Sequence, residues 1–291
     1  MIRASLPAAP GVYRFRDERG TVLYIGRAVD LRRRVRSYWA ELRDRRHLAP
    51  MVRRIARVEA VICDSAHEAA WLERNLLKAR LPRWNRTAGG QEVPVYIKLD
   101  PFPAKPGVKV VHEAGDFGPY LGGDKVRLAV AGLLRAYPLN YTGTRLTGSE
   151  RAMAATLGVG PGDRERLVAA ITAVLRRESK ISDDLETRRD RAANQLAFEL
   201  AGRLQAELEA VEWVTAPQRV TRDSGDLDVY GWAGGILVEF RIRAGRLCAW
   251  TQRPCSAATA GDRLAATPPD WRAFADRTAQ LAQGLAQELT A

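Results

Sequence analysis

Apolar and polar positions alternate in three short runs near the start of the chain, which predicts three β-strands. The runs cover residues 11–15, 21–26 and 58–63. The first two are separated by Asp17-Glu18-Arg19-Gly20, whose polar residues and glycine are typical of a tight turn. We therefore expect an antiparallel hairpin, with the third strand in the same sheet.

Two helices with start signals are interleaved with these strands. Asp30 precedes a basic helix over residues 31–39, where an aspartate accepts a hydrogen bond from an early amide of the helix. Ser65 precedes a second helix over residues 66–80. Glu68, three residues after Ser65, completes the sequence pattern of a capping box. The predicted fold class of this first domain is α+β, with a three-stranded antiparallel sheet flanked by helices.

Three further regions are expected after this domain. A loop-rich segment with one helical stretch is followed by a helical region, whose second helix keeps an apolar period from residue 183 to 213. Strand-like alternation then returns and ends in an amphipathic helix, which predicts a small C-terminal α/β region. The expected boundaries are 1–100, 101–162, 163–216 and 217–291.

Positive charge is concentrated in the first domain. The formal net charge of the chain is +12, and residues 1–86 hold 20 Arg or Lys and 9 Asp or Glu residues, a balance of 20 − 9 = +11. The rest of the chain is also rich in arginine but almost balanced, so a general arginine bias does not explain the surplus. A local surplus indicates a polyanionic partner. We expect this partner to be a nucleic acid, and an anionic membrane or a ribosomal surface is the alternative.

Apolar runs and cysteines limit the cellular setting. No stretch approaches the roughly 18 uncharged apolar residues of a membrane span, and the first residues lack the apolar run of a secretory signal. Cys63, Cys248 and Cys255 form no CxxC pair, which favours neither a disulfide framework nor a zinc or iron–sulfur site. We therefore expect a cytoplasmic protein without an iron–sulfur cluster.

Glu73 occupies an unusual place in the second predicted helix. Its neighbours three and four residues away are Ala69, Ala70, Leu76 and Leu77, so the carboxylate is centred on the apolar stripe. A buried carboxylate is costly unless it is paired. Glu73 therefore needs a metal ion, a cleft or a cation, and a buried salt bridge to an arginine is the simpler interpretation.

Aromatic residues accompany this carboxylate. Tyr13 and Tyr24 lie at matching points of the predicted hairpin, where a pair of tyrosines can also be ordinary cross-strand packing. The helix over residues 31–39 interleaves arginines with Tyr38 and Trp39, which suits phosphate contacts and base stacking. A solvated basic face is the alternative for this helix.

Together these residues resemble the GIY-YIG family of DNA endonucleases. Gly11-Val12-Tyr13 and Tyr24-Ile25-Gly26 are similar to its two motifs. Arg34 stands at the position of the family's catalytic arginine, Glu73 matches its metal-binding glutamate, and Asn85 matches its asparagine. The resemblance implies metal-dependent hydrolysis of a DNA phosphodiester bond.

The resemblance also implies roles for the central residues. Glu73 would hold a single Mg²⁺ or Mn²⁺ ion. Arg34 would clamp the charge that develops on the scissile phosphate. Tyr24 would act as general base after its pKa is lowered by the cation of Arg27 or by the metal.

Further residues are expected to support this chemistry. Tyr13 would orient the attacking water or the general base, and Tyr38 would contact the phosphate. Asn85 would fix the metal-binding glutamate or a neighbouring loop. The residues expected to bind DNA around the site are Arg32, Arg33, Arg36, Lys78 and Arg83.

Within the family, the likeness narrows to UvrC of bacterial nucleotide excision repair and its short homologue Cho. Residues 23–28, 31–38 and 68–78 follow UvrC motifs closely, and residues 193–211 resemble the helical UVR segment that contacts UvrB. The resemblance implies one nick per engagement, 3′ of a lesion in double-stranded DNA. It also implies a UvrB-like partner at residues 193–211.

Two departures from the UvrC pattern limit these expectations. Asn140 follows Pro138-Leu139 where UvrC has a cysteine, so no iron–sulfur cluster is expected. Gln205-Ala206 replaces an Arg-Asp pair in the UVR-like segment. The alternatives are a stand-alone nuclease for defence or for resistance to a DNA-damaging compound, and a catalytically silent DNA-binding adaptor.

Overall fold

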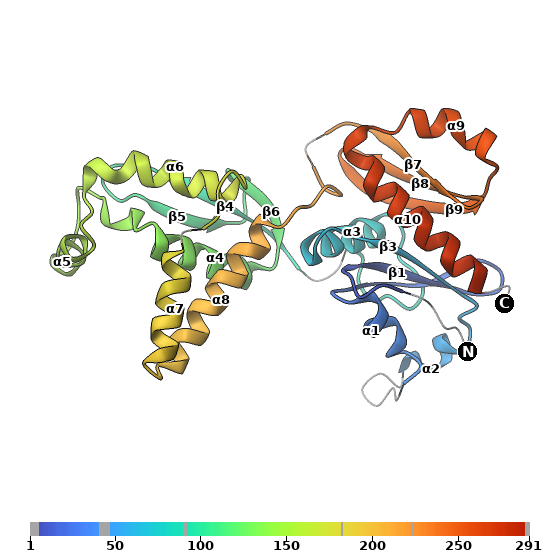
Figure 1. Ribbon diagram of the computed structural model, residues 1–291, viewed down its shortest axis with the longest axis horizontal. Helices are drawn as coiled ribbons and strands as arrows, with labels where there is room; N and C mark the ends of the chain where they lie inside the picture. The colour runs from blue at the N-terminus through green and yellow to red at the C-terminus, as the bar shows by residue number, and fades with distance from the viewer. Residues whose placement is uncertain (1–5, 41–46, 90–91, 182, 223, 289–291) are drawn as a thin grey trace. The chain divides into compact units, whose positions relative to one another are not determined.

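The computed structural model divides the chain into two compact units. One unit combines residues 1–91 with residues 217–291, and the other consists of residues 92–216. Figure 1 shows the chain leaving the first unit and returning to it for the last three strands. The structure describes residues 6–40, 47–89, 92–181, 183–222 and 224–288.

The first unit begins with the expected three-stranded antiparallel sheet. Its strands are β1 (Gly11–Arg16), β2 (Val22–Ala28) and β3 (Arg57–Ile62), in the order β2-β1-β3. Tyr13 in the central strand lies opposite Gly26 on one side and Ala60 on the other. The predicted α+β class is therefore confirmed, and β2 is an edge strand of its sheet.

Three helices accompany this sheet, namely α1 (Leu31–Arg36), α2 (Ala49–Val52) and α3 (Ala66–Ala79). The Asp30 carboxylate accepts the Arg33 amide hydrogen bond at 2.9 Å, and the Ser65 hydroxyl accepts that of Glu68 at 3.0 Å. Both helix starts therefore lie where the capping residues predicted them. The α1 helix ends at Arg36, before the residue 39 expected from the sequence.

Aromatic and aliphatic side chains fill the core of this part of the unit. Its buried residues are Leu6, Tyr13, Phe15, Leu23, Leu31, Val35, Tyr38, Leu48, Met51, Val58, Ala60 and Leu285. Because two tyrosines of the expected site belong to this core, their rings are fixed by packing. Leu285 comes from the far end of the chain.

The C-terminal region completes the first unit. The strands β7 (Leu227–Ala233), β8 (Ile236–Arg243) and β9 (Arg246–Pro254) form an antiparallel sheet, and the helices α9 (Ala257–Ala265) and α10 (Pro269–Glu288) follow. Helix α10 packs against this sheet and against β3, while β9 packs against α3 (Figure 1). The region over residues 217–291, expected as a separate domain, therefore packs with residues 1–91 in one compact unit.

Buried polar contacts join the two ends of this unit. The Arg14 guanidinium pairs with Glu59, donates to the Trp250 carbonyl at 2.9 Å and lies 3.8 Å from the Trp250 ring centroid. The amide of Asn75 donates to the Val220 carbonyl at 3.0 Å. In the sequence, Arg14 and Glu59 belong to the polar face of amphipathic strands. The pattern alone therefore indicated that both side chains face solvent, whereas β9 lies beside Arg14.

The second unit contains its own three-stranded antiparallel sheet, with β4 (Pro94–Asp100), β5 (Gly107–Val111) and β6 (Phe117–Leu121) in the order β5-β4-β6. Helices α4 (Gly123–Ala136), α5 (Gly148–Leu157) and α6 (Arg164–Leu175) follow. The segment expected to be rich in loops thus contains two strands and two helices. Glycine and proline between these short elements obscured them in the sequence.

The helix expected over residues 183–213 is wrong as one continuous element. It is broken into α7 (Asp184–Asn194) and α8 (Phe198–Thr215), which pack side by side as a hairpin (Figure 1). Leu196 has a φ of 58° at the turn, where a helix cannot continue. Among the residues described, no helix is long and apolar enough to cross a membrane.

Candidate active site

Three tyrosines from three elements meet beside the central strand. Tyr13 belongs to β1, Tyr24 to β2, and Tyr38 follows the end of α1. Their ring centroids are 5.9 Å apart for Tyr13 and Tyr38, 6.3 Å for Tyr13 and Tyr24, and 6.1 Å for Tyr24 and Tyr38. The hydroxyl oxygens of Tyr13 and Tyr38 are 2.7 Å apart, within hydrogen-bonding distance. The predicted pair therefore belongs to a larger cluster.

Gly26 leaves the room that this cluster needs. A Cβ atom added to Gly26 would lie 2.5 Å from the Tyr13 hydroxyl oxygen and 2.8 Å from Cε1 of Tyr24. Both distances are below van der Waals contact, so any larger residue would displace a tyrosine. The glycine of the second motif is thus required by a close approach of side chains.

Arg34 brings a guanidinium to the same hydroxyl groups. Its Nε donates to the Tyr13 hydroxyl at 3.3 Å, and its guanidinium carbon lies 5.5 Å from the Tyr38 ring centroid. The side chain is half-buried on α1. A planar, permanently charged group at this place is suited to binding a phosphate in two-pronged fashion.

Glu73 on α3 faces the edge strand. Its Oε1 accepts a hydrogen bond from the backbone amide of Arg27 at 3.2 Å, and its Oε2 lies 3.5 Å from Nε of Arg27. The Glu73 side chain is 21% exposed. Both interpretations of this carboxylate therefore have support in the geometry, because it has a cation beside it and is accessible to solvent.

Asn85 fastens the edge strand on its outer side. Its Oδ1 accepts from the Ile25 amide at 3.0 Å, and its Nδ2 donates to the Ile25 carbonyl at 2.8 Å. We expected Asn85 to fix Glu73 or a neighbouring loop. The hydrogen bonds place its amide on the strand between Tyr24 and Gly26.

Burial raises the pKa of the Tyr24 hydroxyl above its ordinary value, and the neighbouring Tyr38 and Glu73 add to this effect. Arg34 acts in the opposite direction but is outweighed. Without a metal ion, the expected lowering of the pKa of Tyr24 is therefore not seen, and lowering by a bound ion stays a prediction. Arg27 is instead engaged with Glu73.

The residues around Glu73 fit a hydrated magnesium ion. The Glu73 carboxylate, whose charge acts on the Tyr24 hydroxyl, offers oxygen donors, which Mg²⁺ prefers while keeping much of its water shell. Within the described part of the chain, no group of three or more His, Cys, Asp and Glu residues could hold a metal ion. A site built only from such side chains, as zinc requires, is therefore not present there.

The five residues predicted to bind DNA all lie at the surface. Arg33, Arg36, Lys78 and Arg83 are exposed. Arg32 is exposed as well, but its Nε donates to the Leu6 carbonyl at 2.8 Å and so also ties down the start of the chain. The backbone partners of the site, the Arg27 amide and the Ile25 peptide group, were not predicted because side-chain patterns do not reveal backbone donors.

The motifs and their geometry define a GIY-YIG domain. Residues 9–86 match the family model described as the UvrC-like GIY-YIG domain. The chain therefore carries a DNA endonuclease domain of the UvrC-like GIY-YIG class.

The likeness extends beyond that domain. The chain is 33% identical over 247 residues to UvrABC system protein C of Syntrophotalea carbinolica, which covers 78% of this chain and 40% of that protein. It is 32% identical over 267 residues to the same protein of Geobacter metallireducens, which covers 84% of this chain and 43% of that protein. The chain thus spans well under half the length of these relatives.

Solved structures are similar to the N-terminal part. The GIY-YIG N-terminal endonuclease domain of UvrC from Thermotoga maritima, bound to its catalytic magnesium, is 31% identical. The match covers 28% of this chain and 90% of that one, with a TM-score of 0.26.

Proposed function

We propose that the protein nicks one strand of double-stranded DNA by metal-dependent hydrolysis. The observation that carries this proposal is the convergence of Tyr13, Tyr38 and Arg34 around one hydroxyl pair, together with Glu73 of α3, which accepts the backbone hydrogen bond of the β2 residue that follows Gly26. A carboxylate for a cation, a guanidinium for a phosphate and hydroxyl groups for water are what phosphodiester hydrolysis requires.

Each side chain has a separate task in this proposal. Arg34 binds the scissile phosphate and stabilises the charge that it gains. Tyr13 orients Arg34 through their hydrogen bond. Tyr24 takes the proton of the attacking water, and Tyr38 positions that water or the phosphate. A divalent ion held by Glu73 supplies positive charge at the phosphate and favours the ionised form of nearby hydroxyls.

Glu73→Gln tests this proposal, because it removes the charge and keeps the shape. We expect Mg²⁺-dependent nicking of a supercoiled plasmid to fall to background while DNA affinity stays close to that of the wild type. Exposed Glu165 on α6 offers a matched control, Glu165→Gln, with unchanged nicking. Undiminished cleavage by Glu73→Gln would contradict the proposal. DNA binding without nicking by the wild type would favour a silent adaptor.

We further propose that the substrate is damaged DNA and that the nick falls 3′ of the lesion. The support is the likeness to proteins named UvrABC system protein C and the UvrC-like GIY-YIG domain. Incision mapping on a duplex with one defined adduct, with and without UvrA and UvrB, tests the substrate. Equal cutting of undamaged duplex under both conditions would favour a stand-alone nuclease for defence or resistance.

The partner surface that we propose for a UvrB-like protein is the tip of the α7–α8 hairpin. Leu196 is 73% exposed and Phe198 is 67% exposed, whereas Leu204 is 2% exposed and belongs to the core of the hairpin. Leu204 lies within the segment 193–211 expected to contact UvrB, but because it is buried we leave it out of the proposed surface. Co-purification of UvrB with the full chain should be lost on Phe198→Ala. It should persist with Met153→Ala, a change at another exposed apolar residue of the same unit.

A further inference from the structure

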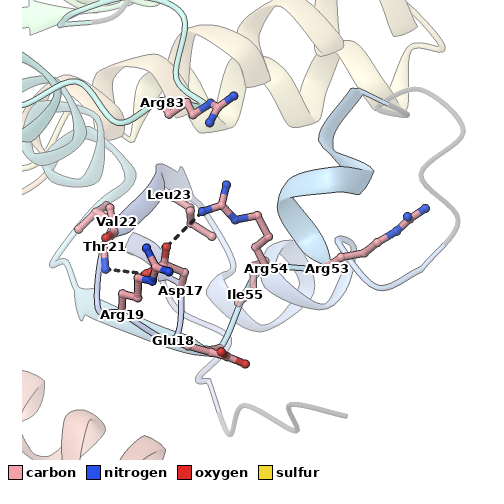
Figure 2. A pocket seen from close by; sticks show the side chains of 11 residues that line it. Asp17, Glu18, Arg19, Thr21, Val22, Leu23, Arg53, Arg54, Ile55 and Arg83 are labelled. Atoms are coloured by element: carbon pink, nitrogen blue, oxygen red, sulfur yellow. Dashed lines mark hydrogen bonds and ion pairs between the residues drawn. The ribbon is translucent and has the colours of Figure 1, made fainter.

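A hollow of about 660 Å³ opens beside the β1–β2 hairpin. Its walls come from the hairpin turn, from residues 53–56, and from Arg83 (Figure 2). All these segments belong to the first unit. None of the residues assigned to the catalytic site lines it.

Arginines dominate the charge of this hollow. Arg19, Arg53, Arg54 and Arg83 line it together with two acidic residues, Asp17 and Glu18, so the lining has a formal charge of 4 − 2 = +2. The Asp17 carboxylate accepts the Thr21 amide at 2.8 Å and pairs with Arg54 at 3.3 Å. One of the two acidic groups is therefore committed to holding the turn.

The arginines of the lining are directed differently. Figure 2 shows the side chain of Arg54 reaching back toward Asp17 and Leu23, and that of Arg53 pointing away from them. Arg83 enters from the segment on the far side of the hollow. Arg54, whose guanidinium also pairs with Asp17, and Arg83 thus line the hollow from two different segments, so an anion bound there can contact both.

Two backbone connections lead from this hollow to the catalytic cluster. The Trp84 amide donates to the Leu23 carbonyl at 3.2 Å, and Asn85 binds both backbone groups of Ile25. Residues 83–85 thus run beside β2, with Arg83 at the hollow and Asn85 at the catalytic end. A strand rises about 3.3 Å per residue, so the four steps from Leu23 to Arg27 span about 13 Å.

This spacing matches a nucleic acid strand. One DNA strand carries a phosphate about every 3.4 Å along the helix axis, so about 13 Å corresponds to a few nucleotides. Arginine is the residue suited to forked phosphate recognition. An exposed Thr21 adds a hydroxyl to the lining.

We propose that the hollow binds one backbone phosphate of the cleaved DNA strand, a few nucleotides from the scissile phosphate, through Arg54 and Arg83. This inference rests on the proposed nuclease function, because it names a second contact of the same substrate. The hollow fixes the register of the strand, while Arg34 and Glu73 act on the phosphate that is cut.

The first test measures DNA binding by the full chain in EDTA, so that no cutting occurs. Fluorescence anisotropy of a labelled duplex gives the slope of log affinity against log salt. We expect the Arg54→Gln/Arg83→Gln double variant to lower that slope by about one, the value for one lost phosphate contact. Arg253→Gln, at an exposed residue outside the hollow, should leave the slope unchanged. An unchanged slope in the double variant would overturn the proposal and favour an acidic protein partner.

The second test locates the phosphate. Single methylphosphonate substitutions, which remove one backbone charge, are placed along the cleaved strand of a nicking substrate. We expect one position, a few nucleotides from the cut, to slow the wild type and to have no further effect on the double variant. Equal sensitivity of both proteins at every position would refute the assignment. If the wild type does not nick at all, the nuclease proposal fails, and the salt slope still decides the phosphate contact.

Discussion

Asn85 pairs with Ile25 through both backbone groups of that residue, as a neighbouring strand would. The amide of Ile25 donates to Oδ1 at 3.0 Å, and its carbonyl accepts from Nδ2 at 2.8 Å. One side chain thus satisfies an edge strand that would otherwise expose unpaired backbone groups at this point. The pairing fixes the position of Ile25 in the strand. It therefore also fixes its two neighbours, Tyr24 and Gly26.

Substitution of Asn85 should therefore affect catalysis through β2. Asn85→Ala removes both hydrogen bonds and should lower the free energy of unfolding by about 1–3 kcal/mol. Nicking should fall more than DNA affinity, because Tyr24 loses its fixed position. Asn85→Asp keeps the acceptor and loses the donor, so its nicking rate should lie between those of Asn85→Ala and the wild type. Denaturant unfolding and plasmid nicking measure the two effects, and Asn85→Ala with full activity would refute this role.

Tyr24→Phe removes only a hydroxyl from a packed cluster. The fold should persist, and the rate of nicking should drop about 10²-fold or more, as expected for a lost general base. Tyr120→Phe, a change at a buried tyrosine of the other unit, serves as control and should keep the wild-type rate. Single-turnover rates on one duplex decide the matter. A Tyr24→Phe protein with the wild-type rate would show that the hydroxyl group is structural.

Arg34→Lys keeps the charge and loses the planar fork. Nε of Arg34 donates to the Tyr13 hydroxyl, and a lysine cannot make this bond while also gripping a phosphate with two parallel donors. We expect nicking to fall by at least about 10²-fold, the loss typical of one transition-state donor. The affinity for uncleaved DNA should change little, since the charge is conserved. A lysine variant with normal turnover would mean that the charge alone suffices.

His67 should make the fold sensitive to acid. Burial lowers the pKa of His67 to about 4 from an ordinary value of 6.5, and its Nε2 accepts the Trp71 indole hydrogen bond at 3.1 Å. The unfolded chain takes up this proton at a higher pH than the folded protein. The contribution of neutral His67 to the free energy of unfolding is therefore fully present above pH 6.5. It is lost as the pH falls toward 4, by about 3 kcal/mol in total.

His67→Gln isolates this contribution, because all other titrating groups are shared with the wild type. The difference in unfolding free energy between the two proteins, measured by urea titration, should change steadily across the window from pH 6.5 to pH 4. A difference that stays constant across the window would show that His67 titrates normally in the folded protein.

Local periodicity and capping residues predicted the sheet and the two capped helices. That Tyr13, Tyr24 and Arg34 lie close together was expected from the resemblance to the GIY-YIG family, because periodicity alone allows ordinary cross-strand packing. The sequence did not predict that residues 217–291 pack onto residues 1–91, since Arg14 and Glu59 are as polar as residues that face water. It also missed the break at Leu196, because the apolar period continues across the turn. Contacts between distant segments have no local signature in a single sequence.

The N-terminal sheet and the strands that cover it are separated along the chain by the whole of the second unit. A ribosome makes about 5–20 residues per second, so residues 92–216 take roughly ten seconds to emerge. During that interval Arg14 and Glu59 have no Trp250 beside them, and α10 has not yet supplied Leu285. The nascent domain is therefore expected to be open to proteases until α10 has been synthesised and has emerged from the ribosome. Pulsed proteolysis of stalled nascent chains would detect this delay as protection that arises only after α10 has left the ribosomal tunnel.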